Sequence, residues 1–301
     1  MQKRSKNATI DRIGFFAVYT CMTQATAVHK KDRAVDRVNN FSHLKNKKMA
    51  KQNSIIKLIG SIDDLTFMET KDGHQVRKKK KSVSKEIIAS DPKYARLREN
   101  MSEFSRAANA SKLMRTAVKE AMLDCADKRV LTRLAKAMFA VLVTDPLSDR
   151  GKRNVMKGDV SLLKEFTFNN TAILSAIFKT DISSGIDRTT GKLTIDIPAF
   201  IPADNIVAPT GATHCKFHSA GAEINFDNGQ FVSKLAESAA IPVGDNQATA
   251  AIHFQHDLTA GSNSPLFLLL GTRFYQEVNG KLYPLKNKAF NTLLVTDAAS
   301  V

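Results

Sequence analysis

Three residues in the stretch THCKFH, namely His214, Cys215 and His218, are of the types that bind transition metals. The neighbouring residues favour a β-strand, in which successive side chains point to opposite faces, so Cys215 is expected to point away from both histidines. His214 and His218 would share a face but stand about 13 Å apart at the usual rise of a strand. A single zinc ion, at ~2.1 Å from each ligand, cannot join them. The spacing therefore predicts no metal site here.

Other combinations of reactive residues are equally weak evidence for a metal or catalytic site. His253 and His256 in HFQH lie three residues apart, which would join them on a helix but not on the strand indicated, and we expect surface or edge histidines. The adjacent pair Asp63-Asp64 is typical of a turn. The sequence contains no nucleophile elbow, phosphate-binding loop, dinucleotide-binding glycine motif or HExxH motif. We therefore predict a protein that is not an enzyme and has no cofactor, with no small-molecule substrate evident.

The cysteines bear on the compartment of the protein. Cys21, Cys125 and Cys215 are too few, odd in number and too far apart for a disulfide framework or a CxxC metal site. A reducing, cytoplasmic location is the expectation. No apolar run approaches the ~20 residues that span a bilayer, so no transmembrane segment is predicted.

The charge of the chain is unevenly distributed. The 301 residues carry a net charge of +16, of which residues 1–160 hold +18 and residues 161–301 hold −2. This asymmetry favours an anionic partner for the first half, such as nucleic acid, an acidic protein surface or anionic lipid. A basic surface that only keeps the protein in solution is the alternative.

Residues 1–48 have three interpretations. The favoured ones are an extension upstream of a true start at Met49, or a disordered basic arm. The third is a signal peptide with a basic start and a small-residue site at Ala25-Thr26-Ala27, which would make the protein secreted. Tyr19, Thr20 and Cys21 interrupt its apolar stretch and weaken that interpretation.

From Met49 the sequence predicts a small antiparallel meander. Apolar residues cluster at 55–59 and then alternate at Leu65 and Phe67, and Gly73 ends a tight turn that begins at Thr70. The last strand runs into five consecutive basic residues, Arg77 to Lys81, which cannot be packed inside a protein. We expect them to form a solvated strand end and loop.

Two helices are expected next. Asp91 can cap the first and Pro92 suits its first position. The apolar residues of this helix step by three and four and predict one core-facing side: Tyr94, Leu97, Met101, Phe104 and Ala108, then Leu113, Met114, Ala117 and Ala121. Asp127 can cap the second helix, which should end at Thr144-Asp145-Pro146. Its predicted core-facing side is Val130, Leu131, Leu134, Met138, Val141 and Leu142.

Two sets of residues in this basic half are candidate contact sites. The candidate contacts to an anionic partner are Arg77, Lys78, Lys79, Lys80, Lys81, Lys85, Arg98, Arg106, Lys112, Arg115 and Lys119. The candidate helix-packing interface consists of the small residues Ala107, Ala108, Ala110 and Ser111. Small side chains let a neighbouring backbone approach closely, either within the subunit or across an interface.

From about Glu165 short strands alternate with turn signals, among them Asp227-Asn228-Gly229 and Asn279-Gly280. This pattern indicates an antiparallel sandwich, immunoglobulin-like or similar. The predicted fold class is therefore α+β, with a β-meander and helical hairpin followed by a β-sandwich. The expected parts are the doubtful or disordered extension 1–48, a basic meander and helical domain 49–160, and a sandwich domain 161–301.

Several stretches resemble a family of uncharacterised Bacteroidetes proteins. They are IIKLIGSIDDLTFMETKDGHQVR, DPKYARLRENMSEFSRAANASKLMRTA, RGKRNV, PAFIPADNIVAPTGATHCKFHSAGAEINFDNG and FYQEVNGKLYPLKNKAFN. The resemblance runs from Met49 to near the end of the chain and implies that Met49 is the true start. It implies no activity, cofactor or fold. The stretch KKKKSVSK departs from the glycine-containing loop of the family, which argues against the lysine run as the family's functional element.

Two functions remain. The first is a structural or assembly protein that forms homo-oligomers or binds an acidic protein partner, a role that asks for no chemistry the sequence lacks. The alternative is nucleic-acid binding by the basic half, directed at the phosphate backbone and not at base sequence. The chain has no tryptophan, and the aromatics of its helical part fit the apolar sides of the helices, so stacking on single strands is poorly supported.

Overall fold

The computed structural model describes residues 50–301 except 54, 72, 80–82 and 287–288. Predictions about the extension 1–48, Met49, Cys21, Lys80 and Lys81 fall outside the described residues. The remaining residues form two compact units, one up to Lys79 and one from Val83 onward. Each unit is described separately.

The first unit is a four-stranded antiparallel sheet. Its strands are β1 (Ala50–Lys51), β2 (Gly60–Ile62), β3 (Leu65–Thr70) and β4 (Gly73–Lys78), in the order β1-β4-β3-β2. The predicted meander is confirmed, and Gly73 has the positive φ of 99° that its turn requires. The apolar residues at 55–59 form no strand and lie in the exposed connection between β1 and β2.

The second unit begins with helices. They are α2 (Lys85–Ser90), the short η2 (Pro92–Tyr94), α3 (Ala95–Ala117), α4 (Lys119–Met122) and α5 (Val130–Val143), followed by the short η3 (Val155–Lys157) and η4 (Val160–Leu163). Asp91 caps η2 by accepting a hydrogen bond from the Lys93 amide at 2.8 Å, and Pro92 follows it as predicted. α5 ends directly before Thr144.

Two antiparallel sheets make up the rest of the unit. The larger contains β7 (His214–Ile224), β8 (Phe231–Glu237), β9 (Ile241–Pro242), β11 (Leu266–Val278), β12 (Lys281–Pro284) and β13 (Thr292–Ala299). In it β11 pairs with β7 on one side and with β12 and β13 on the other, and β8 and β9 lie beyond β7. The smaller has the order β10 (Ile252–Asp257), β6 (Lys192–Ile197) and β5 (Ser183–Asp187). The short helices α6 (Leu174–Ile177) and α7 (Pro202–Asn205) lie in connections.

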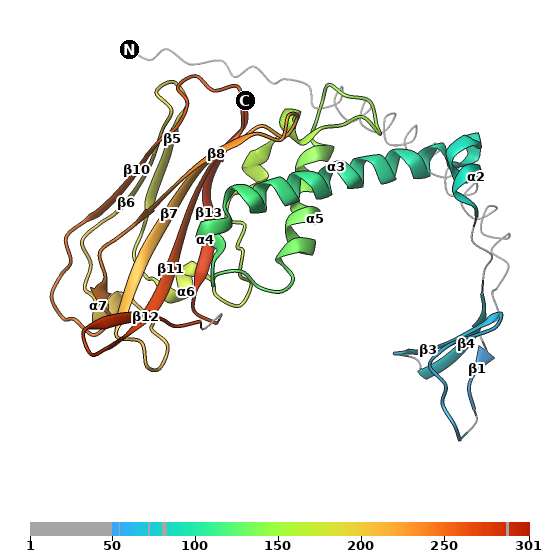
Figure 1. The fold of residues 1–301 in the computed structure, drawn as a ribbon, viewed down its shortest axis with the longest axis horizontal. Coiled ribbons are helices and arrows are strands. Elements are labelled where there is room, and N and C mark those ends of the chain that lie inside the picture. Colours follow the sequence, from blue (N-terminus) through green and yellow to red (C-terminus); the bar gives the residue numbers. More distant parts are fainter. Residues whose placement is uncertain (1–49, 54, 72, 80–82, 287–288) are drawn as a thin grey trace, which may run out of the picture. The chain divides into compact units, whose positions relative to one another are not determined.

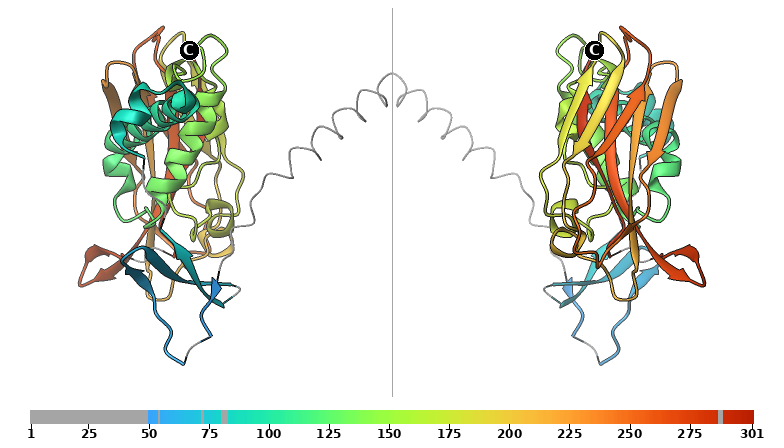
Figure 2. Two further views of the ribbon diagram at one scale, coloured as in Figure 1. Left: turned by 90° about the vertical axis from the view of Figure 1, so that its right-hand side faces the viewer. Right: turned by 90° about the vertical axis from the view of Figure 1, so that its left-hand side faces the viewer.

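These elements form three layers. α3 and α5 cover one face of the larger sheet, and the smaller sheet covers the other (Figure 1). Seen from one side the helices lie in front of the sheets, and from the opposite side strands lie in front (Figure 2). Because both faces of the larger sheet are covered, the run from Leu266 to Thr272 in β11 is buried throughout.

Two apolar cores separate the layers. One lies between the helices and the larger sheet and includes Met114, Leu134 and Phe267. The other lies between the sheets and includes Ile195, Phe217 and Leu268. The α+β class is confirmed. The predicted boundary between residues 160 and 161 lies inside the second unit, since the helices and the larger sheet share the first of these cores.

The predicted core-facing side of α3 is wrong in its first half. Leu97, Met101 and Phe104 are 41%, 58% and 60% exposed. The side that α3 buries is instead Glu103, Ala107, Ala110, Ser111, Met114 and Ala117. Small side chains on this side let the helix backbone approach its neighbours closely. This close packing is favoured over burial of the larger apolar side chains, which lie on another side of the helix.

The predicted side of α5 is correct except at Leu131, which is 50% exposed. Asp127 does not cap this helix as predicted, because Arg129 occupies the N-cap position and no side chain caps the helix, but Asp127 lies shortly before it. Its carboxylate accepts hydrogen bonds from the Arg129 amide at 2.7 Å and from the Arg133 guanidinium at 2.5 Å. The carboxylate therefore ties the first turn of α5 to the preceding loop.

Candidate functional site

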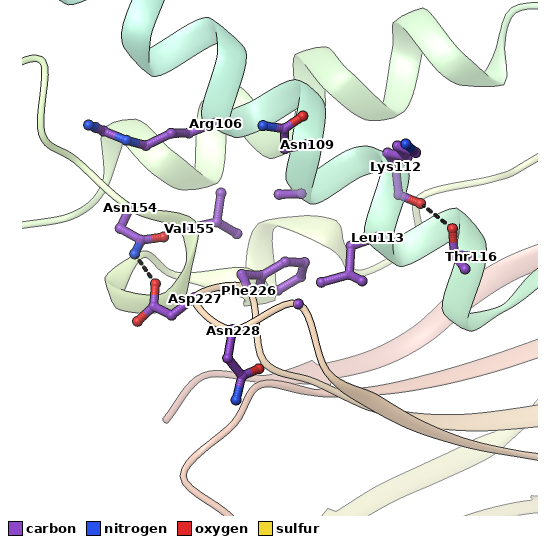
Figure 3. Close-up of a pocket in the computed structure, with 12 residues that line it drawn as sticks. Arg106, Asn109, Lys112, Leu113, Thr116, Asn154, Val155, Phe226, Asp227 and Asn228 are labelled. Atoms are coloured by element: carbon purple, nitrogen blue, oxygen red, sulfur yellow. Dashed lines mark hydrogen bonds between the residues drawn. The ribbon is translucent and has the colours of Figure 1, made fainter.

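A groove of about 550 Å³ opens between α3 and the turn that joins β7 to β8 (Figure 3). α3 contributes a basic and polar wall and the turn contributes the opposite wall, with Asn154 and Val155 between them. The lining residues are Arg106, Asn109, Ala110, Lys112, Leu113, Thr116, Asn154, Val155, Phe226, Asp227, Asn228 and Gly229. The groove thus combines two cationic side chains with an apolar floor.

The turn opposite α3 is built from local hydrogen bonds. The Asn225 side-chain oxygen accepts from the amides of Asp227 and Asn228 at 3.0 and 3.2 Å. Gly229 has a φ of 75°, as expected for the predicted hairpin signal. The Phe226 ring packs edge-on against Phe267 with 6.2 Å between the ring centroids, which anchors the turn to the core.

Arg106 has a structural role in the groove. Its guanidinium donates to the carbonyl oxygens of Gly151 and Arg153 at 2.8 and 3.1 Å. The buried carboxylate of Glu103 accepts from the Gly151 amide at 2.7 Å. The side chain of Asn154 donates to Asp227 (Figure 3). These bonds hold the 151–154 segment between α3 and the turn.

The structure brings some of the predicted anionic-partner contacts together. Lys112 lines the groove, and Arg115 and Lys119 line an adjoining hollow that shares Thr116 with it. Lys112 and Lys119 are exposed. Arg98 instead donates to the carbonyls of Ile88 and Asp91 at 2.7 and 2.9 Å and closes the end of α2.

The remaining predicted contacts lie elsewhere in the chain. Arg77, Lys78 and Lys79 are exposed at the end of β4 in the first unit, and Lys85 is exposed at the start of α2. The helix-packing residues Ala107, Ala110 and Ser111 are buried within the subunit, and Ala108 is half-buried. Their small side chains thus serve packing inside the second unit.

Leu97, Met101 and Phe104, which were predicted to face the core, are exposed together on one side of α3, and we call these three residues the α3 stripe. At about 100° per residue these three side chains fall on one side of the helix, and Ala108, Lys112 and Arg115 continue the same side. The exposed side of α3 is therefore apolar in its first half and cationic in its second.

A buried polar cluster lies where α4 meets the larger sheet. His218 donates through Nε2 to the Ala121 carbonyl at 3.2 Å, and Arg273 donates to the carbonyls of Glu120 and Ala121 at 2.7 and 3.1 Å. The Cys125 thiol lies 4.0 Å from His218 Nε2. Burial, reinforced by the charge of Arg273, lowers the pKa of His218 to about 3. The cluster satisfies the carbonyls at the end of α4 and so joins this helix to the sheet.

Both described cysteines are unreactive in this setting. Burial raises the pKa of the Cys125 thiol to about 11, and burial also raises the pKa of Cys215. Cys215 belongs to the core between the sheets, on the face of β7 opposite His218, as the strand periodicity predicted. Within the described residues no three His, Cys, Asp or Glu side chains are grouped so that they could hold a metal ion.

His256 lies on an edge strand, β10, but it is not at the surface. Its ring is buried between the sheets, 2.8 Å from the Ser219 hydroxyl and directly over Gly221. Burial lowers the pKa of His256, which favours the neutral form of the ring beside Ser219. Ser219 is fully buried, so no substrate can reach it in this arrangement. His253 is exposed as predicted and contacts Asp196 at 2.5 Å.

Compared with known protein families, with curated proteins and with solved structures, the chain shows no match. The resemblance to uncharacterised Bacteroidetes proteins therefore stays a prediction. In the described part of the chain no helix is long and apolar enough to cross a membrane.

Proposed function

We propose that this protein is a non-enzymatic structural or assembly protein that self-associates or binds an acidic partner through the exposed side of α3. The observation that carries this proposal is the α3 stripe, in which Leu97, Met101 and Phe104 are each more than two-fifths exposed. Large apolar side chains gathered on one exposed helix face mark interaction surfaces. Aromatic residues and methionine are also enriched where protein partners meet.

The charges beside the stripe support an acidic partner. Lys112 and Arg115 lie on the same side of α3 as the stripe, and Lys119 follows in α4. Lys112 lines the groove, and Arg115 and Lys119 line the adjoining hollow. An acidic group on a partner would be attracted to these cationic side chains while apolar residues of the partner cover the α3 stripe. Complementary charge of this kind sets orientation and association rate more than affinity.

Two finer predictions belong with this proposal. The pair of antiparallel sheets that share one core supports an immunoglobulin-like sandwich, although a fold does not by itself imply a function. The two buried thiols, which form no disulfide, support a reducing, cytoplasmic location.

Backbone-directed nucleic-acid binding is the second candidate. What favours it is the same set of basic residues, because Lys112, Arg115 and Lys119 could each neutralise a phosphate. The two candidates differ in their response to salt, since phosphate contacts weaken steeply as salt rises whereas apolar contacts do not.

Light-scattering mass of the full chain at low and high salt, with the ratio of absorbance at 260 and 280 nm, tests the proposal. We expect a salt-resistant oligomer with a protein-like ratio. The double substitution Met101→Gln with Phe104→Gln should weaken assembly roughly tenfold or more. Leu131→Gln, at a similarly exposed position on α5, is the matched control and should change nothing. A monomer at high salt that carries nucleic acid at low salt would favour the second candidate instead.

A further inference from the structure

The sheet of the first unit has one apolar and one mostly polar face. Residues paired across antiparallel strands share a face, and the face alternates along each strand. The pairs Phe67–Val76, Leu65–Lys78 and Ile62–Leu65 therefore place Ile62, Leu65, Phe67 and Val76 together. The opposite face carries Ser61, Thr66, Met68, Gln75 and Arg77.

This apolar face is open to solvent. Ile62 and Leu65 are 58% and 43% exposed, and Phe67 and Val76 are half-buried. Among the described residues from 50 to 79, no apolar side chain is buried. A small sheet needs its apolar face covered to be stable in water, so we expect another surface to pack on this face.

The cover is expected over the face and not at an edge. The edge strands β1 and β2 have only two and three residues. Short edge strands offer few backbone groups to a further strand, and proteins use them to prevent such pairing. Packing of a second sheet face to face, at about 10 Å, needs no free edge.

The charges on this face indicate which surface packs on it. Glu69 and Lys78 lie on the apolar face at opposite ends, because Leu65 pairs with Lys78 and Glu69 pairs with His74. A two-fold axis between two such faces, running across the strands, sets the Lys78 end of each sheet over the Glu69 end of the other. Both ends then meet an opposite charge, so the face is complementary to itself.

We infer that the first unit is a dimerisation module, in which the apolar face of its sheet packs on the same face of a second copy of this chain. The inference rests on the proposed self-association but names a surface separate from the α3 stripe. Two interfaces on one chain allow assembly beyond a dimer, since each copy can contact one neighbour through the sheet and others through α3.

Charge reversal tests this inference. Lys78→Glu leaves two acidic ends on the face and Glu69→Lys leaves two basic ends, so each variant repels its own copy. We expect each variant alone to dimerise about tenfold more weakly, and an equimolar mixture of the two to restore dimers as heterodimers. Sedimentation equilibrium of the full chain measures this. Only a contact between copies can be rescued by mixing, because a contact within one chain keeps the same two charges.

The measurement is made in the background of Met101→Gln with Phe104→Gln, so that it does not depend on the α3 stripe. Leu65→Lys on the apolar face should also weaken the dimer, while Thr66→Lys on the opposite face is the matched control and should not. A monomer in this background, or a dimer that neither charge reversal nor Leu65→Lys weakens, would overturn the inference. If the α3 substitutions leave assembly unchanged while the mixing rescue succeeds, the sheet interface stands and the α3 proposal fails.

Discussion

His218 shows how a single buried residue joins two layers of the second unit. Its imidazole occupies space that only a glycine leaves free, because a Cβ added at Gly271 would lie 2.5 Å from the ring. The Nε2 proton is donated to the Ala121 carbonyl, and burial of the ring favours its neutral form. A second proton would place a charge beside Arg273 in the core.

This arrangement predicts a loss of stability in mild acid. The unfolded chain binds a proton at His218 near the ordinary pKa of about 6.5, whereas in the folded protein burial lowers that pKa to about 3. Below about pH 6.5 the unfolded state therefore binds more protons and gains stability. For this group alone the loss of folding free energy from pH 7 to pH 5 is on the order of 2 kcal/mol.

The comparison of wild type with His218→Gln isolates this effect, because glutamine can still donate to the Ala121 carbonyl but does not titrate. Urea unfolding from pH 5 to pH 8 should show a shallower loss of stability in the variant toward acid. Equal slopes for the two proteins would mean that His218 does not remain neutral in the fold.

Part of this residue-level detail was present in the sequence. Ile252, Phe254 and His256 alternate along one strand, and the apolar pair indicates that His256 points inward with them. Because His253 and His256 are three residues apart, they point to opposite faces of the strand, and only His256 is buried. The hydrogen bond of His256 to Ser219 joins two strands of different sheets and could not be predicted from either segment alone.

At the scale of elements, the start of the helical segment was easier to predict than the faces of α3. Asp91 and Pro92 act locally, so their types alone indicate where the helical segment starts. Which side is buried depends on what packs there, and α3 buries alanines where α5 and the sheet approach it. Periodicity of large apolar residues identified a real stripe but not its environment, and that stripe is exposed.

The faces of α3 predict opposite results for two neighbouring alanines. Ala107 is fully buried in the core between helices and sheet, so Ala107→Leu should lower the free energy of unfolding by about 1–3 kcal/mol through overpacking. Ala108 lies on the exposed side, and Ala108→Leu should change it by less than about 0.5 kcal/mol. Urea denaturation followed by circular dichroism compares the two. If the two substitutions lowered stability equally, α3 would have to be rotated about its axis so that Ala107 and Ala108 were equally buried.

For the whole molecule, the sequence predicted the turns and most strands but not the division of the chain. Gly73, Gly229 and Gly280 mark turns through local backbone preferences, and all three have positive φ. The switch in pattern near residue 160 suggested two domains. It marks only the change from helices to strands, because the packing of α3 and α5 on the larger sheet joins residues more than a hundred positions apart.

Two buried thiols report on this shared packing. Cys125 lies in the core between helices and sheet, and Cys215 lies in the core between the sheets, on either side of the predicted boundary. If residues 83–301 unfold as one cooperative unit, both thiols should become reactive at the same urea concentration.

Replacement of Cys21 by serine leaves these two as the reporters, and mass spectrometry after a pulse of thiol reagent assigns the labelled residue. The larger sheet forms a wall of both cores, so loss of either core exposes one face of β7 and β11 and removes support from the other. Labelling of Cys125 at clearly lower urea than Cys215 would show that the helical layer unfolds by itself, and the boundary near residue 160 would then separate two folding units.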